Sequence, residues 1–501
     1  MFVIDRTKVL ELFVYGTWEP AAGVEHEKIL YFFPSEKPLN DKLNSIGLSE
    51  AVVTFTNSFN SVCTSLCTKK TKRVFRKLAP NIWIVIVVSV PTTPNITNGN
   101  LSEDDSIHYQ VIERVLATAC ETFELFHGRV DAVVETYGYE ILKAKLEHFF
   151  SRYLRTMLFE HCDLLDCFNG IQFTSIEPAN FGRVHGLLSR IGYGFSCIEH
   201  SAFFFEGRLV YSSLDLNYVR YIYNYLNSFL FIEQPDLTHS AATSTTMTKS
   251  KHLGRYLVGP KDLSDLSQQV KCPLICSPDS KLPNCQLITY QALRVVLCLL
   301  IKSTDSIPME FFVEFDKMVG PRLTSLAERL ASSQSSSFMG GSIFPLHLME
   351  GASEIDPHKV PTLGGLSIND DGIRNAIEDL NYVDPPLSSI YTNRFIYWNP
   401  STCSVMTTLH VYTGSGKRSI KGAKALLDVM VNLREEFSLR PDLWHQEITV
   451  RLNPHCWIVC KRSNGREVYM VFIIRQDGLR KLEEATRHVY DTTFRGVFLL
   501  E

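Results

Sequence analysis

The sequence lacks an apolar run long enough to cross a membrane. Its longest apolar candidates, Ile82 to Val90 and Val295 to Ile301, have about the length of a strand, whereas a transmembrane helix needs about 18 to 20 apolar residues. The chain also lacks an excess of basic residues, with 50 Lys and Arg against 54 Asp and Glu. Because nucleic-acid-binding proteins usually carry a basic face, the composition argues against nucleic acid as a partner.

A secretory signal is also missing from the sequence. Asp5 and Arg6 stand where a signal peptide needs a continuous apolar region, so we expect no secretory segment and a cytoplasmic protein. The 13 cysteines are odd in number and irregularly spaced between Cys63 and Cys460. This pattern is typical of reduced thiols packed as small hydrophobic side chains.

The motifs of common catalytic sites are absent as well. There is no Gly-x-Ser-x-Gly nucleophile elbow and no His-Glu-x-x-His zinc helix. The glycine-rich stretch Tyr412 to Ser419 fails as a phosphate loop, because Val411 stands where the first glycine is needed and Arg418 separates Lys417 from the hydroxyl. We therefore predict no catalytic residue, and we interpret this stretch as a solvated turn before a helix that begins at Ile420.

Three cysteine pairs raise the question of a metal site. They are Cys63/Cys67, Cys272/Cys276 and Cys456/Cys460. The members of each pair are separated by three residues, whereas zinc ligands are usually separated by two. We predict core or interface thiols, no metal site and no cofactor.

The order of the apolar patterns predicts an α+β protein made of three similar modules. At about 100 to 200 residues per domain, the 501 residues correspond to roughly three domains. In each module, helices would pack on a mainly antiparallel sheet. We place a first domain at 1–160, a second at 161–335, a flexible linker rich in Ser, Gly and Pro at 336–390, and a third domain at 391–501.

The first module begins with two strand-like runs, Val9 to Gly16 and Lys28 to Phe33. A helix is predicted from about Asp41 to Val53. The β-branched run Ile82 to Val88 predicts a strand that is buried on both faces. A polar loop, Pro91 to Asp105, precedes two long helical patterns.

The second and third modules repeat this order. Glu206-Gly207 predicts the turn of a hairpin, and Gly254 to Val258 and Leu293 to Ile301 are strand candidates. From Pro308 to Leu330 the pattern is helical, with a break expected at Gly320-Pro321. The third module contains a helix predicted at Ile420 to Phe437.

A run of basic residues follows the first predicted helix. Its members are Lys69, Lys70, Lys72, Arg73, Arg76 and Lys77. Anionic lipid attracts such segments by about 1 kcal/mol per basic residue. We expect this run to face an anionic or phosphoinositide membrane surface; the alternative is a solvated hairpin that leads into the buried strand.

Several blocks of the sequence together resemble one family. They include Glu27 to Pro34, Ile46 to Thr56, Phe149 to Thr156, Asp163 to Ile171, Gly254 to Pro260 and Met318 to Thr324. In this order they resemble the vacuolar fusion proteins of the caffeine, calcium and zinc sensitivity family, Ccz-one. The resemblance covers nearly the whole chain and depends on collinearity, since none of the blocks is a catalytic signature.

The resemblance implies three longin domains and an obligate partner, Mon-one, built in the same way. The two proteins together would be the guanine-nucleotide exchange factor for the late-endosomal GTPase Rab-seven, with an accessory third subunit in animals. The chain would then be recruited peripherally to late endosomal and lysosomal membranes. The alternative is a longin-type adaptor or tether without exchange activity.

The resemblance also implies that the GTPase lies across the paired first longin domains. In this sequence that location corresponds to the helix within Asp41 to Phe59 and the strand before Pro91. The GTPase-interface candidates are Asn44, Ile46, Leu48, Glu50, Val53 and Thr54. The alternative for these residues is ordinary packing of a helix on its own sheet.

Overall fold

The structure is a computed structural model of the chain. It describes residues 8–18, 25–59, 63–90, 109–157, 167–174, 176–227, 252–265, 269–276, 285–302, 306–339, 394–407, 410–413, 416–419, 423–439, 445–452, 456–474, 478–492 and 494. The polar loop predicted at Pro91 to Asp105 and the linker predicted at 336–390 lie outside these residues, except for 336–339.

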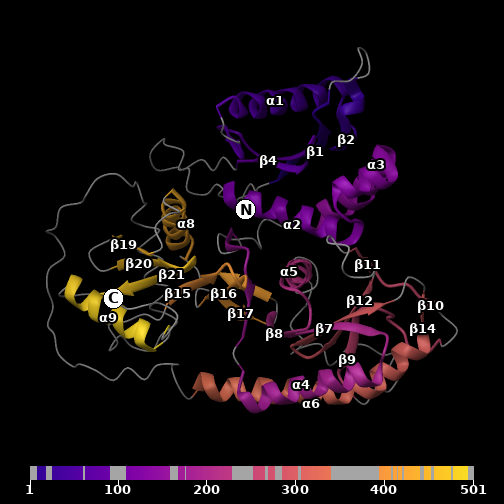
Figure 1. The fold of residues 1–501 in the computed structure, drawn as a ribbon, viewed down its shortest axis with the longest axis vertical. Coiled ribbons are helices and arrows are strands. Elements are labelled where there is room, and N and C mark those ends of the chain that lie inside the picture. Colours follow the sequence, from indigo (N-terminus) through magenta and orange to yellow (C-terminus); the bar gives the residue numbers. More distant parts are fainter. Residues whose placement is uncertain are drawn as a thin grey trace, which may run out of the picture.

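The first unit is an antiparallel sheet covered by helices on both faces (Figure 1). Its elements are β1 (Val9–Gly16), η1 (Glu25–Lys28), β2 (Ile29–Phe33), α1 (Leu39–Asn57), β3 (Ser65–Cys67), β4 (Thr71–Ala79), β5 (Ile82–Ser89), α2 (Tyr109–His127) and α3 (Val130–Thr156). The strand order is β2-β1-β5-β4-β3. Helix α1 covers one face, and α2 and α3 cover the other. The β-branched strand β5 is therefore buried on both faces, as its composition predicts.

The second unit has the same design. Its elements are α4 (Pro178–Gly194), β7 (Ile198–Phe205), β8 (Arg208–Ser212), α5 (Leu216–Tyr225), β9 (Gly254–Val258), β10 (Gln269–Val270), β11 (Leu274–Ile275), β12 (Cys285–Ala292), β13 (Val295–Lys302), β14 (Ile307–Pro308) and α6 (Met309–Met339). The main sheet has the order β11-β12-β13-β7-β8. Helix α5 covers one face, while α4 and α6 cover the other.

The third unit follows the same plan again. Its elements are β15 (Arg394–Asn399), β16 (Ser404–Thr407), β17 (His410–Thr413), β18 (Gly416–Ser419), α8 (Ala423–Leu439), β19 (His445–Arg451), β20 (Cys456–Ser463), β21 (Arg466–Ile473) and α9 (Gly478–Thr492). Its sheet runs β19-β20-β21-β15-β16 and is extended by β6 (Ile171–Gln172). Helix α8 covers one face and α9 the other.

All three units share one strand order. In each sheet, the central strand is the last long strand in the sequence, namely β5, β13 or β21. The first strand, β1, β7 or β15, lies beside it. A helix follows the second strand, β2, β8 or β16, and leads to the strands on the other side of the centre. The α+β fold class with repeated units, predicted from the apolar patterns, is confirmed.

Helix α6 and strand β12 differ from the prediction. Helix α6 does not break at Pro321 but continues through it, because its apolar side is buried in the second unit's core on both sides of the proline, from Met309 to Leu330. Burial outweighs the one backbone hydrogen bond that proline removes. Strand β12 was not predicted, since its sequence mixes polar residues such as Gln286 and Gln291 with apolar ones, although both glutamines are buried.

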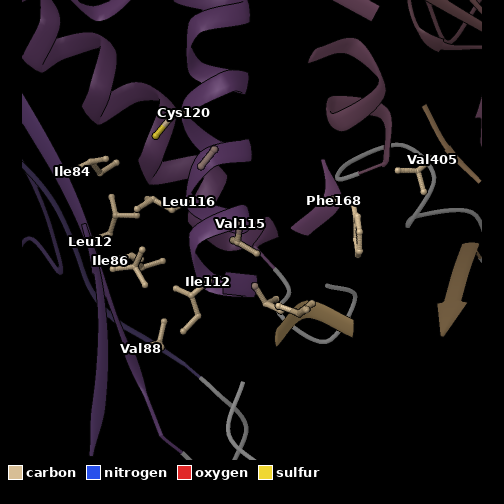
Figure 2. Close-up of a cluster of buried hydrophobic side chains, with 14 of the residues drawn as sticks. Leu12, Ile84, Ile86, Val88, Ile112, Val115, Leu116, Cys120, Phe168 and Val405 are labelled. Atoms are coloured by element: carbon tan, nitrogen blue, oxygen red, sulfur yellow. The ribbon is translucent and has the colours of Figure 1, made fainter. Parts of the chain in front are cut away.

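Helix α2 lies between the three units (Figure 1). Figure 2 shows Ile112 and Leu116 of α2 facing Leu12, Ile84 and Ile86 of the first sheet. The same apolar cluster continues to residues that line the third unit, namely Phe168 and Val405. A helix with apolar residues on several sides is typical of a buried position.

Polar contacts also join α2 to the second unit. The Glu121 carboxylate accepts a hydrogen bond from the Arg114 guanidinium at 2.7 Å and one from the Asn224 amide of α5 at 3.0 Å. The Cys276 amide donates to the Leu125 carbonyl at 2.8 Å. Helix α2 is thus the shared element that fixes the first unit on the second.

Candidate interaction surface on the first unit

Helix α1 carries apolar side chains on the side that faces away from its own sheet. Leu48 and Phe55 are 48% and 66% exposed, and Phe59, just beyond the helix, is 68% exposed. Asn44, Leu48, Ala51 and Phe55 follow one another at intervals of four, three and four residues, so they form one stripe along the helix. We call these four residues and Phe59 the outer face of α1.

The inner side of α1 is unusually polar for a helix that rests on a sheet. Ser45 and Ser49 are buried there beside Ile46 and Val53. Lys28 pairs with Glu50 at 3.1 Å, and Arg73 donates to the Ser49 hydroxyl at 3.5 Å. Few large apolar side chains therefore pack between α1 and its sheet, whereas Leu48 and Phe55 are exposed on its outer face. Exposed apolar patches of this kind mark protein interaction sites.

The six predicted GTPase-interface residues divide between the two sides of α1. Asn44, Leu48 and Thr54 are exposed. Ile46 and Val53 are only 2% and 4% exposed and pack in the apolar cluster under the helix. At these two positions the side chains pack the helix on its own sheet, which is the alternative to contact with the GTPase.

Glu50 is half-buried and bonded to Lys28, at the edge between the two sides. Together with burial, the Glu50 charge raises the pKa of the buried Tyr15 hydroxyl, and burial is the larger cause. Ala51, Phe55 and Phe59 were not predicted from the sequence. The stripe that starts at Asn44 could have revealed the first two, but a second stripe through Ile46 and Val53 obscures it.

The predicted basic run does not form one surface. Along β4 successive side chains point to opposite faces of the sheet. Arg73 therefore lies toward α1, whereas Arg76 lies toward α2. There, burial raises the pKa of Glu113 and Glu124, and the positive charge of Arg76 acts in the opposite direction.

The remaining members of the run lie closer to solvent. Lys69 and Lys70 are exposed in the turn between β3 and β4, and Lys77 is exposed farther along β4. Lys72 is half-buried. The Ser89 amide donates a hydrogen bond to the Lys8 carbonyl, and the amide of the next residue, Val90, donates to the Lys70 carbonyl. Lys8 is therefore exposed at the same end of the sheet as the turn. We call Lys8, Lys69 and Lys70 the basic tip.

The glycine-rich stretch lies in a β-hairpin, and two of the cysteine pairs include buried thiols. Residues His410–Thr413 and Gly416–Ser419 pair as a β-hairpin, so the predicted turn before a helix is wrong in detail. Burial raises the pKa of Cys272 to about 11 and that of Cys456 to about 12, as for unreactive core thiols.

In the part of the chain that the structure describes, no group of three or more His, Cys, Asp or Glu residues could hold a metal ion. Among the same residues, no helix is long and apolar enough to cross a membrane.

Comparison with known proteins fits this arrangement. Residues 11–128, which include all of α2 and all of the first sheet except the first two residues of β1, match the model of the first longin domain of INTU, CCZ1 and HPS4. Residues 198–320 match the Intu longin-like domain 2. The chain is 28% identical to the vacuolar fusion protein CCZ1 homolog of Nematostella vectensis over 98% of both chains. The chain is thus similar to a CCZ1 protein over nearly its whole length.

Two further CCZ1 homologs are similar over nearly their full length. The CCZ1 homolog of Xenopus laevis is 26% identical, with 98% of this chain and 97% of the relative covered. The homolog of Dictyostelium discoideum is 23% identical, with 95% and 94% covered. The outer face of α1 and the basic tip thus lie on, or just beside, the region that matches the first longin domain.

Proposed function

We propose that this chain is the CCZ1-type subunit of a heterodimeric guanine-nucleotide exchange factor for the late-endosomal GTPase Rab-seven. Similarity to a CCZ1 homolog over nearly the whole chain and the two longin matches support a role in vacuolar fusion and membrane trafficking. The observation that carries the finer proposal is the exposed apolar outer face of α1. This face gives a protein partner a surface to bury on the first longin domain.

The proposed activity requires no bond-making residues. An exchange factor binds the GTPase in a form whose switch loops no longer hold magnesium and phosphate, so the binding of factor and nucleotide are negatively coupled and reciprocal. A ~1000-fold faster release needs only about 4 kcal/mol of differential stabilisation. Apolar contact and a few polar groups can supply that amount.

We assign the protein contacts to the exposed positions of α1. Leu48, Phe55 and Phe59 provide apolar surface, and Asn44 and Thr54 provide polar groups. Ile46 and Val53 hold the helix in place beneath this surface. A Mon-one-type longin subunit and the GTPase would share the surface, with the accessory subunit of animals bound elsewhere.

The alternative function is a longin-type adaptor or tether that binds membranes and partners, the GTPase among them in this test, without accelerating nucleotide release. The two differ in the nucleotide state that they prefer. The heterodimer should capture nucleotide-free GTPase from solution at least ~100-fold more tightly than the GTP-bound form, because release depends on that preference. A tether would instead favour the GTP-bound form, and equal capture of all states would contradict the proposal.

We also propose that the basic tip contacts the anionic membrane of late endosomes and lysosomes. Changing Lys69 and Lys70 to Glu should weaken binding to anionic liposomes about 30-fold or more, since each lysine contributes about 1 kcal/mol. Cosedimentation with liposomes measures this. Lys261→Glu with Lys271→Glu is the matched control, because these exposed lysines lie on the second unit and give the same charge change. Equal losses in both variants would show a net-charge effect and reject a specific contact.

Arg73 and Arg76 should behave differently from the basic tip. Arg76→Glu would place a carboxylate next to Glu113 and Glu124 between β4 and α2. We expect it to lower the thermal unfolding temperature rather than to act on lipid binding specifically.

A further inference from the structure

The segment 167–174 connects the first and second units along the chain, yet it belongs to the sheet of the third. Ile171 and Gln172 pair in parallel with Ser404 and Val405 of β16. The Ile171 amide donates a hydrogen bond to a carbonyl of the third unit at 2.7 Å. We call residues 167–174 the connector strand.

The other end of the connector strand pairs with the second unit. Phe173 forms a bridge to Leu209 of β8, and the Thr174 amide donates to the Leu209 carbonyl at 3.1 Å. One short segment thus lies between edge strands of two sheets, β8 and β16. Edge strands expose unpaired amides and carbonyls, and an added strand satisfies them.

Arg434 of α8 holds the start of the connector strand. Its guanidinium carbon lies 4.5 Å from the ring centre of Phe168 on the connector and 4.5 Å from that of Trp398 on β15. The same group donates to the Cys167 carbonyl at 3.2 Å and to the Glu467 carboxylate at 3.2 Å. Because a planar guanidinium can stack and donate at once, Arg434 fits this position better than lysine would.

Gly170 allows the connector strand to approach β16 closely. A Cβ at this position would lie 1.9 Å from Cγ2 and 3.2 Å from the backbone nitrogen of Val405. Phe168 and Ile171, on either side, are fully buried in two apolar clusters. Backbone pairing, stacking and apolar burial all occur within a few residues.

We propose that the connector strand is a docking strand which holds the third unit on the rest of the chain independently of the covalent link through residues 340–393. Residues 167–174 contact β16 and α8 directly, and Arg434 of α8 links them to Trp398 of β15 and Glu467 of β21. Tyr109 of α2 adds a hydrogen bond to Glu435 of α8. The third unit and the junction between the first two then move as one body. This inference does not depend on exchange activity.

The test uses the full chain with a protease recognition sequence inserted between Gly364 and Gly365. After cleavage, the two fragments should coelute at the position of the intact chain in size-exclusion chromatography and separate only in denaturant. Elution as two separate species without denaturant would overturn the proposal.

Three variants test whether the connector strand is responsible. In the cleaved chain, Gly170→Val and Arg434→Ala should each cause the fragments to separate, and Arg434→Lys should do so partially. Gly186→Ala is the control, because nothing lies within 4 Å of a Cβ at that helical glycine. If the cleaved Gly170→Val and Arg434→Ala chains coelute like the control, the docking contact lies elsewhere and the proposal is wrong.

Hydrogen exchange gives a second readout that needs no variant. In the uncut chain, the Ile171 and Thr174 amides should exchange slowly, because both donate to carbonyls of the other units. Rapid exchange at both amides would contradict a docked strand.

Discussion

Aspartate at Leu48 and Phe55 is expected to reduce nucleotide release by the assembled complex about 100-fold. Both side chains are exposed on the outer face of α1, so the fold of the chain itself should survive. In the complex, each carboxylate would be buried against an apolar partner surface without a counter-charge, at a cost of at least ~1 to 3 kcal/mol. About 2.7 kcal/mol in total corresponds to a factor of ~100.

The same double variant should fail to copurify with the Mon-one-type partner if the outer face contacts that subunit. Tyr193→Asp with Leu439→Asp is the matched control, because these residues are also exposed and apolar but lie on α4 and α8. Circular dichroism checks that both variants fold. Normal copurification and normal nucleotide release by the variant with aspartate at Leu48 and Phe55 would show that α1 is not part of the interface.

Alanine at Glu121 is expected to destabilise the junction between the first and second units by about 3 kcal/mol. Glu121 and Arg114 form an ion pair in which both side chains are nearly buried, and Asn224 completes it from α5. Removing one partner leaves an uncompensated buried charge, which typically costs 3 to 5 kcal/mol. Hydrogen exchange should become faster in α2 and α5 together, because the pair connects them.

The control for this variant is Glu140→Ala. Glu140 pairs with Lys143 on the surface of α3, where the carboxylate is mostly exposed. Exposed pairs contribute about 0 to 1 kcal/mol, so hydrogen exchange should hardly change. Similar effects from Glu121→Ala and Glu140→Ala would show that the buried pair does not secure the junction.

Much of the fold could be predicted from the sequence because its periodic segments are long. Strand β1 was predicted at Val9–Gly16, and β9 at Gly254–Val258, as the structure has them. The hairpin turn at Glu206-Gly207 was also correct, and both residues have positive φ. Local propensity and tertiary packing favour the same structure in such segments.

The candidate site was harder to predict because a helix with two apolar stripes does not reveal which one faces the sheet. In α1, Ile46 and Val53 lie inside, while Leu48 and Phe55 lie outside. The difference comes from contacts far apart in the sequence, such as those of Arg73 with Ser49 and of Lys28 with Glu50. Only the folded chain brings these groups together.

The basic run shows a related limit. The sequence groups six cations within nine residues, but strand alternation sends Arg73 and Arg76 to opposite faces of β4. The pairing of the connector strand with the third unit could not be predicted either, because the two paired residues of β6 are too few to indicate which sheet they join.

The most direct test of the account is release of fluorescent GDP from membrane-bound Rab-seven. The chain, copurified with its Mon-one-type partner, is added to anionic liposomes that carry the GTPase, and release is followed with excess unlabelled GTP. We predict release at least ~100-fold faster than with liposomes alone, and loss of that acceleration with aspartate at Leu48 and Phe55. Release no faster than the liposome control would contradict the proposed exchange function.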